Sequence, residues 1–206
     1  MMILGLTGSI GMGKTTVANW FAERGVPVSG SDEIVHALYA EDGAAVGPVA
    51  ARFPGVAVDG AIDRQKLSTA LAADAAGFGD LEAIVHPLVR DAQRTFLHDA
   101  NASGAALALL DIPLLFETQG DARVDAVVVV ACSDETQRER VLQRTDMTAD
   151  KFEAIKARQM PTAEKLRLAD FVIDTDLTLA ESEAAVDRLV KALKGRLGSA
   201  FVRCWS

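Results

Sequence analysis

Short apolar runs alternate with longer amphipathic stretches along this chain of 206 residues. Five runs rich in valine, isoleucine and leucine have the length of strands, and they cover residues 2–6, 26–29, 105–112, 124–132 and 170–174. Continuously apolar runs are typical of strands that are buried on both faces. Because helical stretches separate them, the pattern predicts an α/β fold with a parallel sheet flanked by helices.

Two segments are too long to be simple connections between strands. Residues 32–104 carry apolar positions at three- and four-residue spacing, which predicts a helical insertion. Residues 138–167 hold eight Lys and Arg against five acidic residues, and this local basic excess suits a lid. We therefore expect residues 1–206 to form a single domain, with a core made of residues 1–31, 105–137 and 168–200.

Composition narrows the classes of partner. The formal net charge of −8 and the pI near 4.9 provide no overall attraction for nucleic acid or an anionic membrane. The longest uninterrupted apolar run, residues 126–132, is far shorter than the roughly 18 residues of a membrane span. Cys132 and Cys204 have no metal-site or disulfide spacing. We expect a cytoplasmic protein with no nucleic acid, membrane or obligatory protein partner.

The stretch "GLTGSIGMGKTTV" at residues 5–17 has the G-x-x-x-x-G-K-[ST] pattern of a phosphate-binding loop. It follows an apolar strand and precedes a helical stretch, as that pattern requires. Backbone N–H groups and the helix N-terminus attract phosphate, the lysine reaches the β- and γ-phosphates, and Thr15 offers a hydroxyl ligand to Mg²⁺. The expected ATP contacts are Gly11, Met12, Gly13, Lys14, Thr15 and Thr16.

A phosphate-binding loop leaves several functions open. A GTPase needs an Asn-Lys-x-Asp element, but Asn19 and Asn101 are followed by Trp and Ala. Mechanical ATPases are usually larger or oligomeric. A short chain with two insertions suits a small-molecule kinase, which must enclose its acceptor away from water. Another metabolite or nucleotide kinase, or a nucleotide-binding regulator without transfer activity, remains an alternative.

Two aspartates follow predicted strands, where open α/β sheets bind ligands. Asp32 is a candidate general base for the acceptor hydroxyl, and its alternative role is a helix N-cap. Asp111 ends the run "LALLD" and resembles a Walker B acid that holds Mg²⁺, with capping as the alternative. The apolar segment that follows, with Pro113 and Leu114, predicts a pocket rim that ends at Glu117.

Basic side chains offer phosphate and acceptor contacts. Gln137, Arg140 and Arg144 have the i, i+3, i+7 spacing of one helix face, which suits either a phosphate clamp or a solvated face. His86 and Arg90 stand four positions apart, beside a proline that we expect to kink its helix. They are candidates for the acceptor site, with a structural histidine as the alternative.

These motifs together resemble the dephospho-CoA kinase family. The resemblance runs through "SDEIVH", "LEAIVHPLVR", "DIPLLFE", "QRERVLQR", "RQMPTAEK" and "ADFVID" and spans nearly the whole chain. It implies Mg²⁺-dependent transfer of the ATP γ-phosphoryl group to the ribose 3′-hydroxyl of dephospho-CoA. It also implies a catalytic set of Asp32, Lys14 and Arg140, a nucleotide contact from Arg144, and an acceptor site containing Asp32, His86, Arg90, Pro113 and Leu114.

One segment departs from the family pattern. After "FVID" the family usually has an asparagine and then a glycine turn, whereas this chain continues with Thr175, Asp176 and Leu177.

Overall fold

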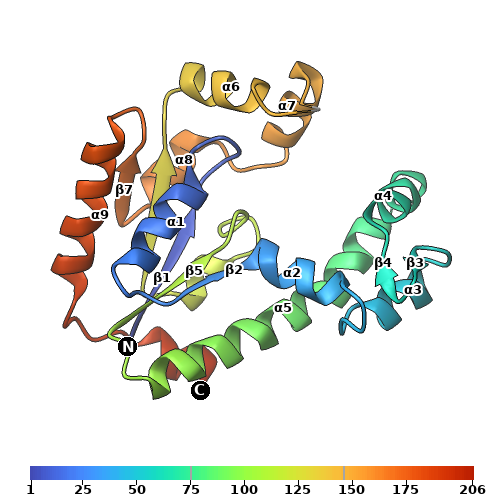
Figure 1. Ribbon diagram of the computed structural model, residues 1–206, viewed down its shortest axis with the longest axis horizontal. Helices are drawn as coiled ribbons and strands as arrows, with labels where there is room; N and C mark the ends of the chain where they lie inside the picture. The colour runs from blue at the N-terminus through green and yellow to red at the C-terminus, as the bar shows by residue number, and fades with distance from the viewer. Residues whose placement is uncertain (75, 146) are drawn as a thin grey trace. The chain divides into compact units, whose positions relative to one another are not determined.

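A five-stranded sheet organises the computed structural model, which describes residues 1–74, 76–145 and 147–206 (Figure 1). Its strand order is β2-β5-β1-β6-β7, and the pairs β1–β5, β1–β6 and β6–β7 are parallel. The strands are β1 (Met2–Thr7), β2 (Val28–Gly30), β5 (Leu107–Asp111), β6 (Ala126–Ala131) and β7 (Phe171–Asp174). Each lies within or across one of the five predicted apolar runs, so the predicted fold class is confirmed.

The chain divides into two compact units. Unit 1 contains Met1–Ser29 and Leu97–Ser206, and unit 2 contains Gly30–Phe96. Unit 2 overlaps most of the predicted insertion, but residues 97–104 belong to unit 1. The helices of unit 1 are α1 (Lys14–Glu23), α6 (Asp134–Leu142), α7 (Ala149–Lys156), α8 (Thr162–Leu168) and α9 (Leu179–Leu193), with short helical turns at Gly120–Arg123 and Phe201–Trp205.

Unit 2 is mainly helical, as the spacing of its apolar residues predicts. It contains α2 (Ser31–Tyr39), α3 (Val46–Arg52), α4 (Arg64–Ala73), the hairpin of β3 (Ala57–Val58) and β4 (Ala61–Ile62), and most of α5 (Gly77–Ala102). Helix α5 continues as one element through Pro87. Its own core is formed by Tyr39, Val49, Phe53, Val56, Ile62, Leu67, Leu71 and Val85.

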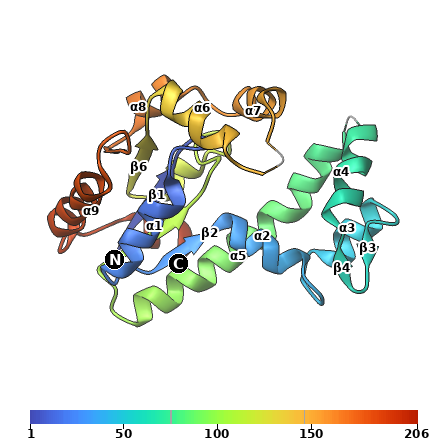
Figure 2. The ribbon, with the colours of Figure 1, turned by 45° about the horizontal axis from the view of Figure 1, so that its top comes forward.

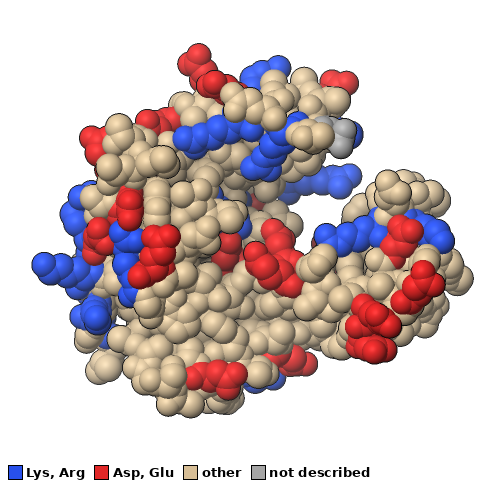
Figure 3. Space-filling view, in the orientation of Figure 1, with Lys and Arg blue, Asp and Glu red and all other residues tan. Residues whose placement is uncertain are grey.

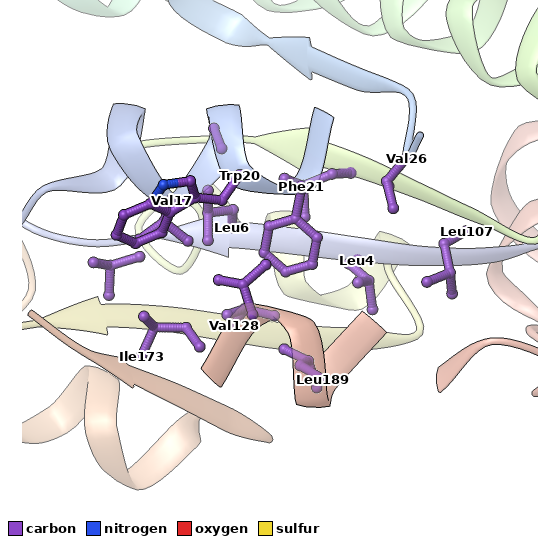
Figure 4. Close-up of a cluster of buried hydrophobic side chains, with 14 of the residues drawn as sticks. Leu4, Leu6, Val17, Trp20, Phe21, Val26, Leu107, Val128, Ile173 and Leu189 are labelled. Carbon is purple, nitrogen blue, oxygen red and sulfur yellow. The ribbon is translucent and has the colours of Figure 1, made fainter. Parts of the chain in front are cut away.

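The core of unit 1 lies between the sheet and helices α1 and α9. Leu4 and Leu6 of β1 are fully buried with Val17 and Phe21 of α1 and with Val128 of β6 (Figure 4). Arg24 follows α1 and donates to the carboxylates of two α9 residues, Asp187 and Glu183. The apolar core holds α1 against the sheet, and Arg24 joins the end of α1 to α9.

The carboxyl-terminal segment packs at the other end of the sheet. The carboxylate of Asp125 accepts hydrogen bonds from the N–H groups of Ile3, Ser199 and Ala200. Trp205 is buried and donates from its indole to the carbonyl of Arg123 over 2.8 Å. The segment therefore closes the amino-terminal end of the sheet. Among the helices of the described residues, none is both long and apolar enough to cross a membrane.

Removing side-chain volume at the centre of the sheet should destabilise the whole protein. Leu109 of β5 is fully buried, so Leu109→Ala should lower the free energy of unfolding by about 2–5 kcal/mol in urea titrations. Leu197 is 96% exposed, and Leu197→Ala should change it by less than about 0.5 kcal/mol. Equal effects at both positions would contradict the assignment of the core.

Candidate active site

The loop between β1 and α1 has the backbone of a phosphate-binding loop. Gly11 and Gly13 have φ values of 82° and 85°, a left-handed conformation that side chains with a Cβ rarely adopt. Gly13 is the N-cap of α1, and the N–H groups of the first turn have no partner within the helix. These N–H groups and the positive end of the helix dipole form an anion site.

The loop also packs tightly on its neighbours. A Cβ on Gly8 would lie 2.7 Å from the carbonyl oxygen of Val130 in β6. A Cβ on Gly11 would lie 2.5 Å from Cγ2 of Val141 and 3.1 Å from the carbonyl oxygen of Gln137, both in α6. Figures 1 and 2 both show α6 at the end of the sheet where β1 and β6 finish. The loop is therefore held between the sheet and α6.

Lys14 and Asp111, two predicted site residues, form an ion pair. Nζ of Lys14 lies 2.5 Å from Oδ1 of Asp111, although the residues are 97 positions apart in sequence. Asp111 ends β5 and is level with Leu6 near the end of β1, so parallel pairing brings its carboxylate to the loop. Both side chains are largely shielded from solvent, at 15% and 12% exposure. Thr15 and Thr16, by contrast, are exposed.

Arg140 is anchored to the segment that departs from the family pattern. Its guanidinium donates to Oγ1 of Thr175 over 3.0 Å and to the carbonyl oxygen of Thr175 over 2.7 Å. The buried Thr175 hydroxyl in turn donates to the carbonyl oxygen of Met12 in the loop, over 2.9 Å. Thr175 therefore connects Arg140 to the phosphate-binding loop.

The prediction that Gln137, Arg140 and Arg144 share one helix face is wrong for Arg144, whereas Gln137 and Arg140 both lie in α6. Helix α6 ends at Leu142, and Arg144 lies beyond it as an exposed residue. Gln137 is fully buried, so it faces the protein interior. The helix ends early because the chain turns towards α7, a change of direction that the spacing of charges does not encode.

Figure 3 shows Lys and Arg side chains gathered over α6 and α7. Two of the basic residues in these helices pair with acids of the other helix. Arg138 lies 3.5 Å from Glu153, and Lys156 lies 2.9 Å from Asp134. These two ion pairs connect α6 with α7.

The segment after β5 is fixed at several points. The carbonyl oxygen of Pro113 accepts a hydrogen bond from the hydroxyl of Thr7 over 3.1 Å. Glu117, the predicted end of a pocket rim, accepts from the N–H of Met160 and pairs with Nζ of Lys165 at 3.0 Å. Lys165 is only 1% exposed, and Glu117 compensates the charge of its buried ammonium group. Leu114 lies in this segment and is exposed.

In unit 2, Asp32 lies in the first turn of α2. The N-cap of α2 is Gly30, so the alternative prediction that Asp32 caps this helix is wrong. The N-cap lies two residues before Asp32 because α2 begins at Ser31, directly after the last residue of β2. An exposed carboxylate in a first turn is favoured by the helix dipole. His86 is half-buried on α5, and Arg90, one turn further on, is exposed.

Comparison with known proteins identifies the family of this chain. A family model described as dephospho-CoA kinase matches residues 2–181. The chain belongs to the dephospho-CoA kinase family. The dephospho-CoA kinase of Agrobacterium fabrum is 56% identical over 97% of this chain and 100% of its own length. That of Mesorhizobium japonicum is 54% identical over the same shares.

Solved structures agree on the fold. A crystal structure from Thermus thermophilus superposes with a TM-score of 0.80 at 31% identity, covering 93% of this chain and 96% of that one. The dephospho-CoA kinase of Campylobacter jejuni superposes with a TM-score of 0.70 at 22% identity, with the same coverage. Membership of the dephospho-CoA kinase family makes this chain an ATP-dependent kinase.

Sequence reasoning missed the contacts of three polar residues in this dephospho-CoA kinase family member. They are Gln159, which bonds the loop, Lys165, which pairs with Glu117, and Thr175, which anchors Arg140. Gln159 and Lys165 lie in the motif "RQMPTAEK", which carried the resemblance without any assigned chemistry. A lysine in a short, largely polar helix gives no sign in the sequence that it is buried, so its partner becomes visible only in the structure.

A methyl group at Gly11 should disturb nucleotide binding specifically. Gly11→Ala adds a clash with Val141 to the backbone strain of a positive φ, so we expect ATP affinity to fall at least tenfold in titration calorimetry. Gly104 has a φ of +79° with open space around it. Gly104→Ala should lose about 1–2 kcal/mol of stability and bind ATP normally. Equal ATP affinity in the two variants would refute the packing argument.

Proposed function

We propose that this chain transfers the γ-phosphoryl group of ATP to the ribose 3′-hydroxyl of dephospho-CoA, giving CoA and ADP. The supporting observation is the glycine-shaped anion site at the start of α1, with Lys14 held beside it by Asp111. Family membership supports the choice of acceptor. Both cysteines are free, which supports a reducing, cytoplasmic location.

In this proposal Lys14 exchanges partners when ATP binds. Without an anion, the carboxylate of Asp111 compensates the charge of the largely buried ammonium group. The β- and γ-phosphates carry more negative charge, so Lys14 turns to them and neutralises charge that develops during transfer. The carboxylate of Asp111 would then help to hold Mg²⁺. The ion pair therefore keeps both charged groups beside the anion site before ATP binds.

The residues beside Lys14 fit Mg²⁺. Magnesium prefers oxygen ligands, keeps several waters, and binds through one or two carboxylates together with substrate phosphates. Thr15 offers a hydroxyl in the first turn of α1 and Asp111 a carboxylate at the end of β5. The described residues contain no group of three or more His, Cys, Asp and Glu side chains suited to a metal, which agrees with a site of few protein ligands. When bound, Mg²⁺ would neutralise phosphate charge.

We assign the general base to Asp32. It is an exposed carboxylate two residues after β2, and open α/β sheets bind ligands beyond the carboxyl ends of their strands. In this proposal Asp32 accepts the proton of the 3′-hydroxyl. The acceptor is held by His86, Arg90, Pro113 and Leu114.

Arg140 and Arg144 are proposed to meet the phosphoryl oxygens. A guanidinium has five N–H donors, and each terminal nitrogen of Arg140 places one hydrogen bond on Thr175. The remaining N–H groups are then presented in a fixed orientation. Because Thr175 fixes this orientation, Arg140 would meet the transferring group without a large entropic cost.

A panel of acceptors tests the proposed reaction. The protein is incubated with ATP and Mg²⁺ and with dephospho-CoA, with nucleoside monophosphates, or with buffer alone. ADP formed only with dephospho-CoA supports the proposal, and formation with another acceptor supports a different metabolite kinase. Binding of ATP without turnover in any arm supports a regulatory protein. Lys14→Ala is the inactive control.

The proposed base makes a specific prediction. An amide cannot accept the hydroxyl proton, so Asp32→Asn should lower kcat by about 10²-fold or more. Because Asp32 is exposed and is not the N-cap, the melting temperature and ATP affinity should stay near wild type. Glu33→Gln is the matched control, since Glu33 is an exposed acid in the same turn. Turnover of Asp32→Asn within a few-fold of wild type would remove Asp32 from proton transfer.

A further inference from the structure

Both polar backbone groups of Ile10, inside the phosphate-binding loop, are held by glutamine side chains from other segments. The N–H of Ile10 donates to Oε1 of Gln159 over 3.0 Å. The carbonyl oxygen of Ile10 accepts from Nε2 of Gln137 over 2.7 Å. Gln137 lies in α6, and Gln159 lies between α7 and α8. The two amides therefore attach the loop on both sides to the segment that follows β6.

Gln137 is a poor choice for stability alone. Its side chain is fully buried, and no group of the described chain donates a hydrogen bond to its Oε1 atom. An unsatisfied buried acceptor costs at least as much free energy as one neutral hydrogen bond contributes. An apolar side chain of similar length would avoid this cost. The bond from Gln137 to Ile10 therefore points to a role in shaping the loop as well as in folding.

The position of Ile10 supports this role. It immediately precedes Gly11, whose positive φ begins the turn that leads to the first turn of α1, where the anion site lies. Such a glycine-rich loop has many alternative conformations when no ligand is bound. Fixing Ile10 through both of its polar groups removes much of this freedom in advance. Donors that are already oriented bind and stabilise developing charge without a reorganisation cost.

We infer that Gln137 and Gln159 are positioning residues that preorganise the phosphate-binding loop for ATP. Gln159 acts as a hydrogen-bond acceptor and Gln137 as a donor. The conformation of the loop therefore depends on the position of α6 and on that of the residues around Gln159. The inference rests on the proposed function only where turnover is measured.

Methionine replacements test this inference because methionine has a similar length and lacks the amide. In Gln137→Met and Gln159→Met, kcat/KM for ATP should fall roughly 10- to 100-fold, as for other misplaced reactive groups. KM for dephospho-CoA should stay within about twofold of wild type. The melting temperature of Gln137→Met should stay near that of wild type, because the replacement removes the unsatisfied Oε1 acceptor of Gln137 but leaves the carbonyl of Ile10 without this donor. A purely structural residue would give the opposite result, a lower melting temperature with normal kinetics.

A matched control lies on the same segment. The amide of Gln143 is exposed and contacts Glu139, one turn earlier in the chain, rather than the loop. Gln143→Met should match wild type in kinetics, ATP affinity and melting temperature. If kcat/KM for ATP fell as far in Gln143→Met as in the other two variants, the loss would not depend on contact with the loop. The inference would then fail.

Amide hydrogen exchange and ATP titration test the inference without turnover, so they remain decisive if dephospho-CoA proves not to be the acceptor. The Ile10 amide should exchange faster in Gln159→Met than in wild type. Gln159→Glu keeps an acceptor oxygen and should restore its protection. Unchanged protection and unchanged ATP affinity in Gln159→Met would overturn the inference, as would a loss of activity that follows a lower melting temperature.

Discussion

Lys14 and Asp111 meet because β1 and β5 lie side by side and run in the same direction. The carboxyl ends of parallel strands reach the same edge of a sheet, so a lysine just after one strand faces an acid that ends the other. The central position of β1 is essential to this arrangement. With β5 on one side and β6 on the other, β1 delivers the loop to an edge where both neighbours supply contacts.

The loop is supported by polar contacts as well as by the burial of Met12 in the core. Thr175 bonds Met12, Gln137 and Gln159 bond Ile10, and Thr7 bonds the segment after β5. A glycine-rich loop has few side chains of its own to pack, so its neighbours must hold its backbone. Hydrogen bonds are directional, and they can therefore specify a loop conformation that apolar contacts would leave variable.

Charge is distributed to suit an anionic nucleotide in an acidic protein. The net charge is −8, yet Lys14 and Lys165 are held in partly or fully buried places beside single carboxylates. A buried ion pair contributes little net stability, but removing one partner is costly, about 3–5 kcal/mol. The two ion pairs differ in what they hold in place. Lys14 sits at the anion site and can exchange partners, whereas Lys165 fixes the segment from Pro113 to Glu117 and the start of α8.

The sequence by itself determined the α/β class, the five strands, the phosphate-binding loop and the family. These features depend on local periodicity and on a motif in which each residue type has its own chemical task, so they can be recognised without long-range information. The pairing of Lys14 with Asp111 was not predicted, because the sequence does not show that β5 lies beside β1. Only the tertiary structure decided that α6 ends before Arg144, that Gly30 caps α2, that Gln137, Gln159 and Thr175 contact the loop, and that Lys165 pairs with Glu117. Each of these outcomes depends on which segments pack together, because a polar side chain has the same local pattern whether it faces water or a buried partner.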